Sequence, residues 1–277
     1  MKRIKNMIVR NISPAIRDSI VEMRDYFRIF PRKALINNDE FTVLPDKFWL
    51  SFNRGTWEPQ LREFYKRHIS SDKMVIDIGG YIGPSVFLAS SYRPKKIIVV
   101  EADPINFEKL KKNCELNSLQ DEVELHHYCI FNKTGETVRF GPMDRILPHP
   151  AINGIGGEGS ETETISFQKF LSGCDLDSTN IVKIDIEGGE RFISEGLDYI
   201  AGYPGIYIYL ALHPPFWPEK EEIADMLLGS FERFDIFTDT EKHLPKQKLR
   251  KMILSDQKTY YAEKRGLFFD IILKTKE

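Results

Sequence analysis

Residues 74–85 read MVIDIGGYIGPS, and this stretch decides the fold. Its apolar run is typical of a strand buried on both faces, although it contains the acid Asp77. Gly79, Gly80 and Gly83 follow; glycines allow positive φ and leave room for a ligand to lie against the backbone. A proline comes next, and it suits the first position of a helix. The stretch therefore predicts a strand, a glycine turn and a helix, with a ligand site where the strand ends.

Short apolar runs rich in Val and Ile alternate with amphipathic stretches along the rest of the chain. Such alternation is typical of βαβ units, whose strands form a mostly parallel, doubly wound α/β sheet. The last apolar run, residues 266–274, has no helix after it. We expect this run to insert as an antiparallel strand near the edge of the sheet.

Composition limits the class of protein. The 277 residues suit one large domain with or without an extension, and 42% hydrophobic residues are typical of a globular protein. The formal net charge of −2 argues against nucleic acid as the main partner. The sequence contains no run of about twenty apolar residues, so no transmembrane segment is expected. Three cysteines without metal-type spacing, and a basic start without a signal-peptide core, predict a reduced cytoplasmic protein.

Residues 1–44 stand outside the alternation, and we predict a basic, partly helical extension before a main domain at 45–277. Apolar residues recur in it at helical spacings of three and four: Ile16, Ile20, Met23, Phe27 and Phe30. Such a helix is expected to pack on its own domain or on a second copy of the chain, giving a homodimer. A helix on a membrane surface or on another partner is the alternative.

Two further segments have compositions of their own. Residues 141–164 are rich in Gly, Pro and Glu and long for a connector, which predicts a mobile flap near the site, with a disordered loop as the alternative. Residues 242–251 are basic, and we interpret them as a solvated loop. Contact of these basic residues with an anionic substrate is the alternative.

The ligand is indicated by a second strand end. Glu101 closes the apolar run after the glycine turn, where its carboxylate can accept hydrogen bonds from two ribose hydroxyls. The dinucleotide fingerprint G-x-G-x-x-G fails whether it is started at Gly79 or at Gly80. The sequence instead has an acid before the glycines, which favours a cation over a phosphate. S-adenosylmethionine carries a sulfonium and an ammonium group, so we predict it as the cofactor, with a nicotinamide dinucleotide as the alternative.

Three blocks then carry a resemblance to a known family. They are GTWEP at 55–59, VVEADPINFEKLKKNCELN at 99–117 and VKIDIEGGE at 182–190. In these blocks the chain resembles the FkbM-type S-adenosylmethionine-dependent methyltransferases, over roughly residues 45–215. The resemblance implies a class I methyltransferase fold, which is Rossmann-like and has a seven-stranded, mostly parallel sheet, one antiparallel strand and helices on both faces. It also implies methyl transfer to a hydroxyl group of a sugar, glycan or similar polyhydroxylated acceptor.

The sequence departs from the family pattern at the turn, where Gly80 replaces the usual Ala and Tyr81 the usual Asn. We predict cofactor contacts around the two strand ends and the upstream block. The residues are Glu58, Asp77, Gly79, Gly80, Tyr81, Gly83, Ser85, Glu101, Ala102, Asp103 and Asp185.

Catalytic candidates lie at the ends of two later apolar runs. Alternation along a strand places Lys183 and Asp185 on one face, and His213 ends the next run. We predict that Asp185, Glu187 and His213 serve the acceptor, by taking its proton or orienting a sugar. For His213 the alternative is a polar residue that closes the strand before two prolines. A structural ion pair between Lys183 and Asp185 is the alternative, and a divalent cation such as Mg²⁺ beside these acids is left open.

The remaining polar and aromatic residues near these runs receive plainer interpretations. Glu190 is interpreted as a cap or charge at the start of the next helix. Phe216 and Trp217 are interpreted as loop anchors, with a stacking platform for a sugar as the alternative. His126 and His127 are adjacent on a strand and point to opposite faces, so they cannot chelate one ion. Two other functions stay open: a nicotinamide-dependent oxidoreductase and a non-catalytic protein that binds a partner.

Overall fold

The computed structural model describes residues 31–37, 39–140, 160–255 and 268–276. The chain divides into two compact units, Met1–Pro59 and Gln60–Glu277, and each is described by itself. Within the described ranges, every helix is too short or too polar to cross a lipid bilayer.

The first unit contains a β-hairpin that the sequence analysis did not predict. Strands β1 (Arg32–Ile36) and β2 (Asp39–Val43) pair antiparallel, and burial alternates along β1. Helix α3 (Phe48–Asn53) follows, and its Asn53 side chain accepts a hydrogen bond from Leu35 N at 2.9 Å. The predicted helix over residues 16–30 lies outside the described residues, and the boundary at residue 44 stays a prediction.

A seven-stranded sheet forms the centre of the second unit, in the order β11-β12-β10-β9-β3-β4-β5. Its strands are β3 (Met74–Ile78), β4 (Lys96–Glu101), β5 (Val123–His127), β9 (Thr179–Ile184), β10 (Tyr207–Leu212), β11 (Phe234–Thr238) and β12 (Phe269–Thr275). β12 runs antiparallel to both β10 and β11, whereas the pairs from β10 to β5 are parallel. The expected parallel sheet with one antiparallel strand is therefore confirmed.

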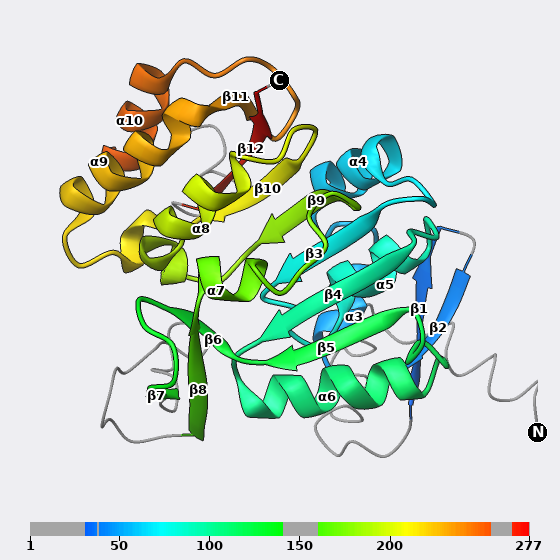
Figure 1. The fold of residues 1–277 in the computed structure, drawn as a ribbon. Helices are drawn as coiled ribbons and strands as arrows, with labels where there is room; N and C mark the ends of the chain where they lie inside the picture. Colours follow the sequence, from blue (N-terminus) through cyan, green and yellow to red (C-terminus); the bar gives the residue numbers. More distant parts are fainter. Residues whose placement is uncertain (1–30, 38, 141–159, 256–267, 277) are drawn as a thin grey trace, which may run out of the picture. The chain divides into compact units, whose positions relative to one another are not determined.

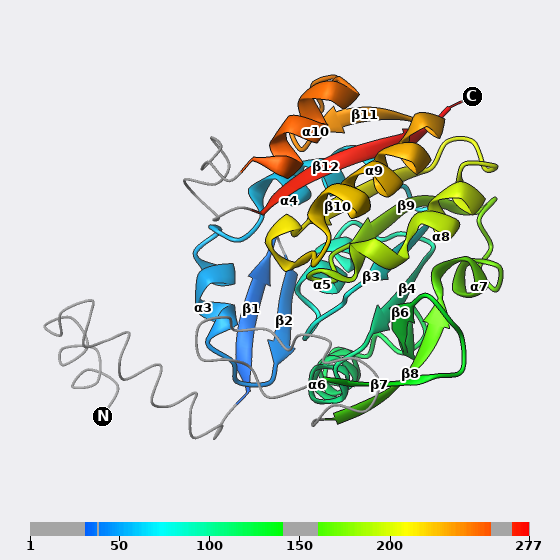
Figure 2. The ribbon, with the colours of Figure 1, turned by 90° about the vertical axis from the view of Figure 1, so that its left-hand side faces the viewer.

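Helices cover both faces of this sheet (Figures 1 and 2). One face carries α4 (Pro59–His68), α5 (Pro84–Ser90) and α6 (Pro104–Glu115). The other carries α7 (Phe167–Leu171), α8 (Ser194–Ile200), α9 (Lys220–Ser230) and α10 (Lys246–Leu254). Single 3-10 turns lie at η1 (Gly189–Phe192), η2 (Pro214–Phe216) and η3 (Phe231–Arg233). This arrangement confirms the class I methyltransferase fold.

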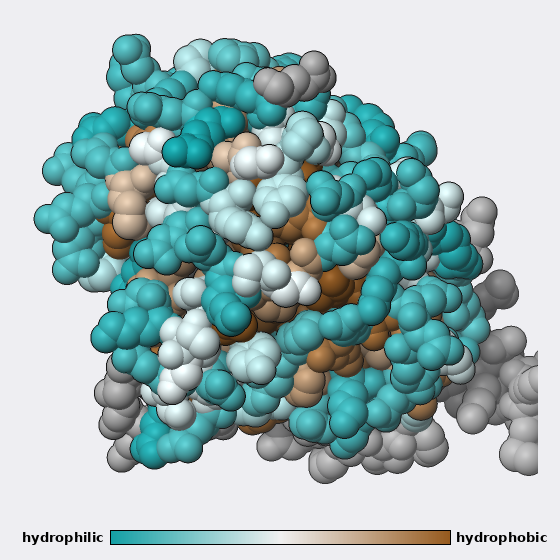
Figure 3. Space-filling view, viewed as in Figure 1, coloured by the Kyte–Doolittle hydropathy of each residue, from teal (hydrophilic) through white to brown (hydrophobic). Residues whose placement is uncertain are grey.

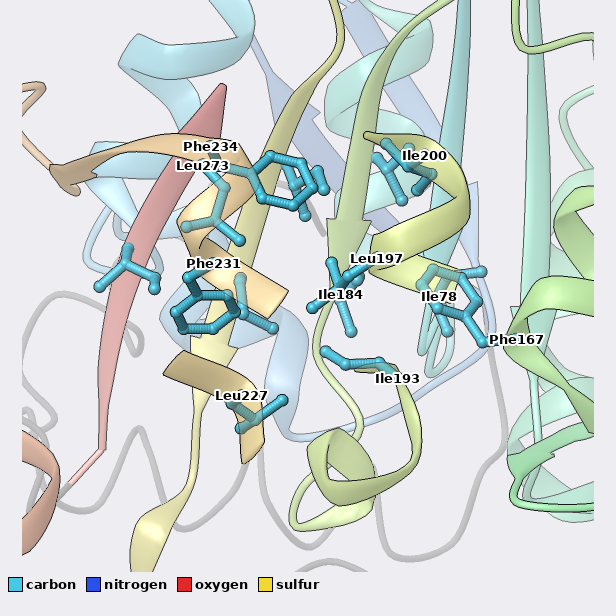
Figure 4. Close-up of a cluster of buried hydrophobic side chains, with 14 of the residues drawn as sticks. Ile78, Phe167, Ile184, Ile193, Leu197, Ile200, Leu227, Phe231, Phe234 and Leu273 are labelled. Carbon is cyan, nitrogen blue, oxygen red and sulfur yellow. The ribbon is translucent and has the colours of Figure 1, made fainter. Parts of the chain in front are cut away.

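The face under α7 to α10 holds the larger apolar core. Alternate residues of the strands, such as Ile78 and Ile184, belong to this core together with Leu197 of α8 and Leu227 of α9 (Figure 4). Each fully buried side chain of this size contributes about 1.5–3 kcal/mol. The intervening residues face α4 to α6 and include the charged Asp77 and Lys183, which pair with each other on that side of the strands.

Two predicted loops contain regular structure. Residues 160–164 belong to β8 (Ser160–Ser166), which lies between β6 (Cys129–Phe131) and β7 (Thr137–Phe140) in a small sheet. The predicted flap therefore ends earlier, and residues 141–159 lie outside the described residues. The basic stretch at 242–251 is also wrong as a loop, because most of it forms α10, where Leu249 and Ile253 are buried. Hydrophilic side chains cover most of the face in Figure 3, with hydrophobic ones in small patches between them.

Candidate cofactor and acceptor site

The glycine turn joins the ends of three neighbouring strands. Gly79 N and Gly80 N both donate to Val100 O on β4, at 2.8 and 3.1 Å. Gly79 has φ +93°, and a Cβ there would lie 1.9 Å from the backbone oxygen of Asp185, just after β9. Room for a ligand was the expected reason for this glycine. The structure gives another reason, which is the close approach of two backbones.

The other two glycines are also enclosed by protein atoms. A Cβ on Gly80 would lie 2.4 Å from Val99 Cγ1, so the alanine usual at this position would require Val99 to move. Gly83 has φ +107° and precedes α5, and its Cβ would lie 3.1 Å from Leu110 Cδ1. The departure at Gly80 is thus matched by the packing of Val99 beneath the turn.

Glu101 connects the turn to the end of β4. Its carboxylate accepts hydrogen bonds from Tyr81 N at 2.7 Å and from Asp103 N at 2.8 Å. One bond reaches each oxygen, so each retains a lone pair for a further donor such as a ribose hydroxyl. Burial raises the pKa of Glu101 to about 8. The two backbone N–H groups lower this pKa, and the neighbouring charges of Asp103 and Asp77 raise it further. Tyr81 has a left-handed φ of +50°, which this bond helps to hold.

The two residues after Glu101 have structural partners. Asp103 caps α6 by accepting a hydrogen bond from Asn106 N at 2.8 Å. Ala102 O accepts from Thr162 Oγ1 at 2.7 Å and lies 3.2 Å from His127 Nε2. These contacts place both predicted residues next to Glu101 and fix the backbone around it.

Asp77 is held inside the protein by two neighbours. Asp77 and Lys183 lie opposite each other on β3 and β9, with exposed fractions of 1% and 3%. Lys183 Nζ lies 3.2 Å from Asp77 Oδ1, and Ser85 Oγ donates to Asp77 Oδ2 at 2.5 Å. Burial raises the pKa of Asp77, and the Lys183 ammonium opposes that rise. Asp77 and Ser85 are therefore hydrogen-bonded to each other inside the protein, and their contact with the cofactor stays a prediction.

Asp185 and His213 are brought together where β9 and β10 end. Asp185 Oδ1 lies 3.7 Å from His213 Nε2, and Asp185 Oδ2 lies 3.6 Å from Lys183 Nζ. The Asp185 side chain is 26% exposed, whereas His213 is buried. Both the catalytic interpretation of Asp185 and its pairing with Lys183 agree with these distances.

Glu190 is the residue that sequence reasoning placed least well. Its fully buried carboxylate lies 2.7 Å from His213 Nδ1 and accepts hydrogen bonds from Trp217 Nε1 at 2.9 Å and Gly188 N at 3.0 Å. The expected capping role is thus only one of its contacts, since its main partners are side chains that follow β10. Trp217 is buried by the same contact, which confirms it as a loop anchor. No periodicity in the sequence signals this arrangement, because it depends on two loops meeting.

Burial and neighbouring charges shift the pKa values of two catalytic candidates. Burial raises the pKa of the half-buried Glu187 to about 8, and the Asp185 carboxylate adds to the rise. Burial alone lowers the pKa of His213, but the carboxylates of Glu190, Asp185 and Glu187 outweigh it and raise the value to about 9. These neighbours favour the imidazolium form of His213 at neutral pH, whereas the sequence analysis expected a proton acceptor, and its role in catalysis stays a prediction.

The comparison with known protein families bears directly on this site. The sequence matches the methyltransferase FkbM domain over residues 77–228, more than half of the chain. The chain belongs to this family. It is an S-adenosylmethionine-dependent methyltransferase, as the resemblance implied, and the matched range runs from the glycine turn to α9.

Other comparisons add less. No curated protein matches the FkbM-family chain. An rRNA methylase from Streptococcus thermophilus aligns at 10% identity and a TM-score of 0.45, over 78% of this chain and 94% of the other. Geranyl diphosphate C-methyltransferase from Streptomyces coelicolor aligns at 12% identity and a TM-score of 0.45, over 83% of each chain. The M. jannaschii tRNA m1G37 methyltransferase aligns at 16% identity and a TM-score of 0.44, over 96% of this chain and 70% of the other. Similarities at this level do not indicate an acceptor.

The charges of the strand ends fit the cofactor of this FkbM-family enzyme. Five carboxylates gather there against two cations, Lys183 and His213, and the acids are Asp77, Glu101, Asp185, Glu187 and Glu190. In the ligand-free protein the pKa values of Glu101 and Glu187 are raised to about 8, so these two acids are largely neutral at pH 7. A sulfonium or ammonium group bound beside them would favour their ionised forms, whereas a pyrophosphate would oppose them.

The structure offers no support for a metal ion among the described residues, and it does not test the predicted cofactor contact of Glu58. Among the described residues, no three His, Cys, Asp or Glu side chains are placed to hold a metal ion, so Mg²⁺ has no support there. His126 and His127 instead contact Glu124 and Ala102 separately, as their opposite faces predicted. Glu58 lies in the first unit with a left-handed φ of +37°, and its contact with the cofactor stays a prediction.

Proposed function

We propose that this methyltransferase transfers the methyl group of S-adenosylmethionine to a hydroxyl of a sugar, glycan or similar polyhydroxylated small molecule. The observation that carries the proposal is the cluster of Asp185, Glu187 and His213 at the ends of β9 and β10. A hydroxyl acceptor must lose a proton during the transfer, and this cluster offers the carboxylate of Asp185 to receive it. A positioned base typically contributes about 10²- to 10⁴-fold to the rate.

The residues of the chain divide between the two substrates. When bound, S-adenosylmethionine supplies a methyl group already activated by the positive sulfur. Glu101 and the turn around Gly79 would hold the adenosyl portion, since Glu101 retains lone pairs for ribose hydroxyls. In the transfer the acceptor oxygen would gain the methyl group carried by the sulfonium and lose its proton to a carboxylate oxygen of Asp185, because the raised pKa of Glu187 keeps that side chain largely protonated at neutral pH.

Two features favour a neutral polyhydroxylated acceptor. The surplus of acids at the strand ends disfavours an acceptor with phosphate groups, and therefore a nucleic acid. Aromatic rings flank the cluster: Phe268 lies 4.9 Å from the His213 ring, and Phe216 stacks on His213 at 6.0 Å with an interplanar angle of 8°. Phe216 and Phe268 are half-buried, so their remaining surface can pack against a sugar ring.

The test is transfer of a labelled methyl group from S-adenosylmethionine by the full chain. The acceptor panel contains neutral sugars, glycans, sugar phosphates and RNA, each with Mg²⁺ and with a chelator. We expect labelling of a neutral polyhydroxylated acceptor in both conditions and its loss in Asp185→Asn combined with Glu187→Gln. Labelling of RNA alone, or of none of the hydroxyl acceptors, would overturn the proposal. The cytoplasmic location and the homodimer through the N-terminal helix stay predictions.

A further inference from the structure

We propose that Glu190 is a positioning residue that holds His213 as an imidazolium whose Nε2–H faces Asp185, so that the acceptor's proton goes to a carboxylate and not to His213. The statement about the acceptor's proton rests on the proposed function. The statement about His213 does not, because it concerns the protein alone.

Glu190 is saturated with donors. Its Oε1 lies 2.7 Å from His213 Nδ1 and 3.2 Å from Gly188 N, and its Oε2 lies 2.9 Å from Trp217 Nε1 and 3.0 Å from Gly188 N. Hydrogen bonds of this number favour the ionised form of a carboxylate. The tryptophan and the backbone are neutral donors, so within these contacts only His213 can supply the positive charge that a fully buried carboxylate requires.

The second nitrogen of His213 decides its protonation. A carboxylate lies at each nitrogen, Glu190 at Nδ1 and Asp185 at Nε2, the latter at 3.7 Å. A neutral imidazole carries one N–H, so it would point a lone pair at one of the two carboxylates. The imidazolium presents an N–H to both. Glu187 adds a third acid nearby. Lys183 lies 3.6 Å from the far oxygen of Asp185, but it lies closer to Asp77, at 3.2 Å.

This arrangement assigns His213 a fixed role. A protonated His213 cannot accept a proton, but its positive charge keeps Asp185 oriented and stabilises negative charge that develops on the acceptor oxygen. The proton lost by the acceptor hydroxyl therefore passes to an oxygen of Asp185, since the raised pKa of Glu187 keeps that side chain largely protonated at neutral pH. The rings of Phe216 and Phe268 lie beside the His213 ring, with centroids at 6.0 and 4.9 Å, and His213 is buried.

The test is an NMR titration of the six histidines in the full chain, labelled with ¹⁵N and ¹³C and kept in a chelator. The His213 signals are assigned by their loss in His213→Asn. In the wild type we expect the imidazolium form to persist to about pH 9. In Glu190→Gln the midpoint should fall by more than about one pH unit, because removing a neighbouring opposite charge shifts a pKa by roughly 1–3 units.

Trp217→Phe is the matched control. It removes another donor to the same carboxylate and leaves the contact with His213, so the midpoint should stay within about half a pH unit of the wild type. If Glu190→Gln does not fold, Asp185→Asn replaces it, and the midpoint should again fall. A wild-type midpoint at or below the ordinary value, or an unchanged midpoint in the Glu190 or Asp185 variant, would overturn the proposal. These readouts need no acceptor, so they fail independently of the methyl-transfer assay.

Discussion

Lys183→Met isolates the effect of burial on an ion pair. The substitution keeps an unbranched side chain in place but removes the ammonium 3.2 Å from Asp77 Oδ1. Asp77 is 1% exposed, and Ser85 would remain as its hydrogen-bond donor. Removing one partner of a buried pair lowers the free energy of unfolding by about 3–5 kcal/mol, because a charge is left uncompensated. At about 2–4 °C per kcal/mol for a chain of this size, the melting temperature should fall by roughly 10 °C.

The assay is urea unfolding followed by circular dichroism at pH 7, with two comparisons. Lys96→Met removes the ammonium from a pair with Glu124 at 2.5 Å, but these side chains are 39% and 42% exposed. It should cost less than about 1 kcal/mol, although the distance is shorter. Lys183→Met combined with Asp77→Asn should recover most of the loss, because no lone buried charge remains.

The pH dependence of the Lys183→Met deficit provides a sign test. Burial raises the pKa of Asp77, and without Lys183 only the hydrogen bond from Ser85 remains to oppose that rise. The folded variant then binds a proton more tightly than its unfolded chain, so its deficit should grow as the pH rises. A Lys183→Met protein as stable as the Lys96→Met protein would refute the reasoning, and so would a deficit that shrinks as the pH rises.

Three further predictions concern the turn, the cofactor and pH. Gly79→Ala should lower the free energy of unfolding by more than about 3 kcal/mol, because a clash with the Asp185 backbone adds to the strain of a positive φ. The control is Gly135→Ala, where φ is +82° and a Cβ would meet no atom within 4 Å, and it should cost only about 1–2 kcal/mol. Equal losses of the two variants in urea unfolding would contradict this. Glu101→Ala should weaken binding of S-adenosylhomocysteine at least about tenfold by titration calorimetry, and an unchanged Kd would remove Glu101 from the cofactor site. The melting temperature of the ligand-free protein should fall between pH 6.5 and 9. His213 has a higher pKa in the folded protein than in the unfolded chain, so its stabilising effect is complete below pH 6.5 and is lost as the pH rises to about 9. Glu187 also has a raised pKa, so the folded protein loses further stability as the pH rises to about 8. A flat melting profile over this range would contradict the assigned protonation states.

The fold could be predicted because its determinants are local. Apolar runs of five or six residues alternate with amphipathic stretches, and that alternation suffices to predict a parallel sheet with its strand ends at one edge. Prediction failed where the pattern was short or mixed. In the hairpin, β1 and β2 are only five residues long, and charged residues occupy the start of each strand. In α10, the buried Leu249 and Ile253 stand among many basic residues.

The site could be predicted only as far as strand order allows. Asp185 and His213 end adjacent strands, so their proximity follows from topology. The reason for Gly79 lies in a backbone oxygen more than one hundred positions away, and Glu190 meets its partners through loops of irregular shape. Contacts of that kind have no periodicity, so the sequence could name these residues but not their neighbours.

The placement of β12 has a consequence for how the molecule is made. β12 comes after β11 in the chain, yet it lies between β10 and β11. While the polypeptide emerges from the ribosome, β10 therefore has an open edge until residues 269–275 arrive, and β11 has no strand beside it. Chains that stop shortly before residue 269 should expose the unpaired edge of β10, which His213 follows, and should bind holding chaperones. Chains that include residues 269–275 can pair β12 with both β10 and β11 and so cover that edge.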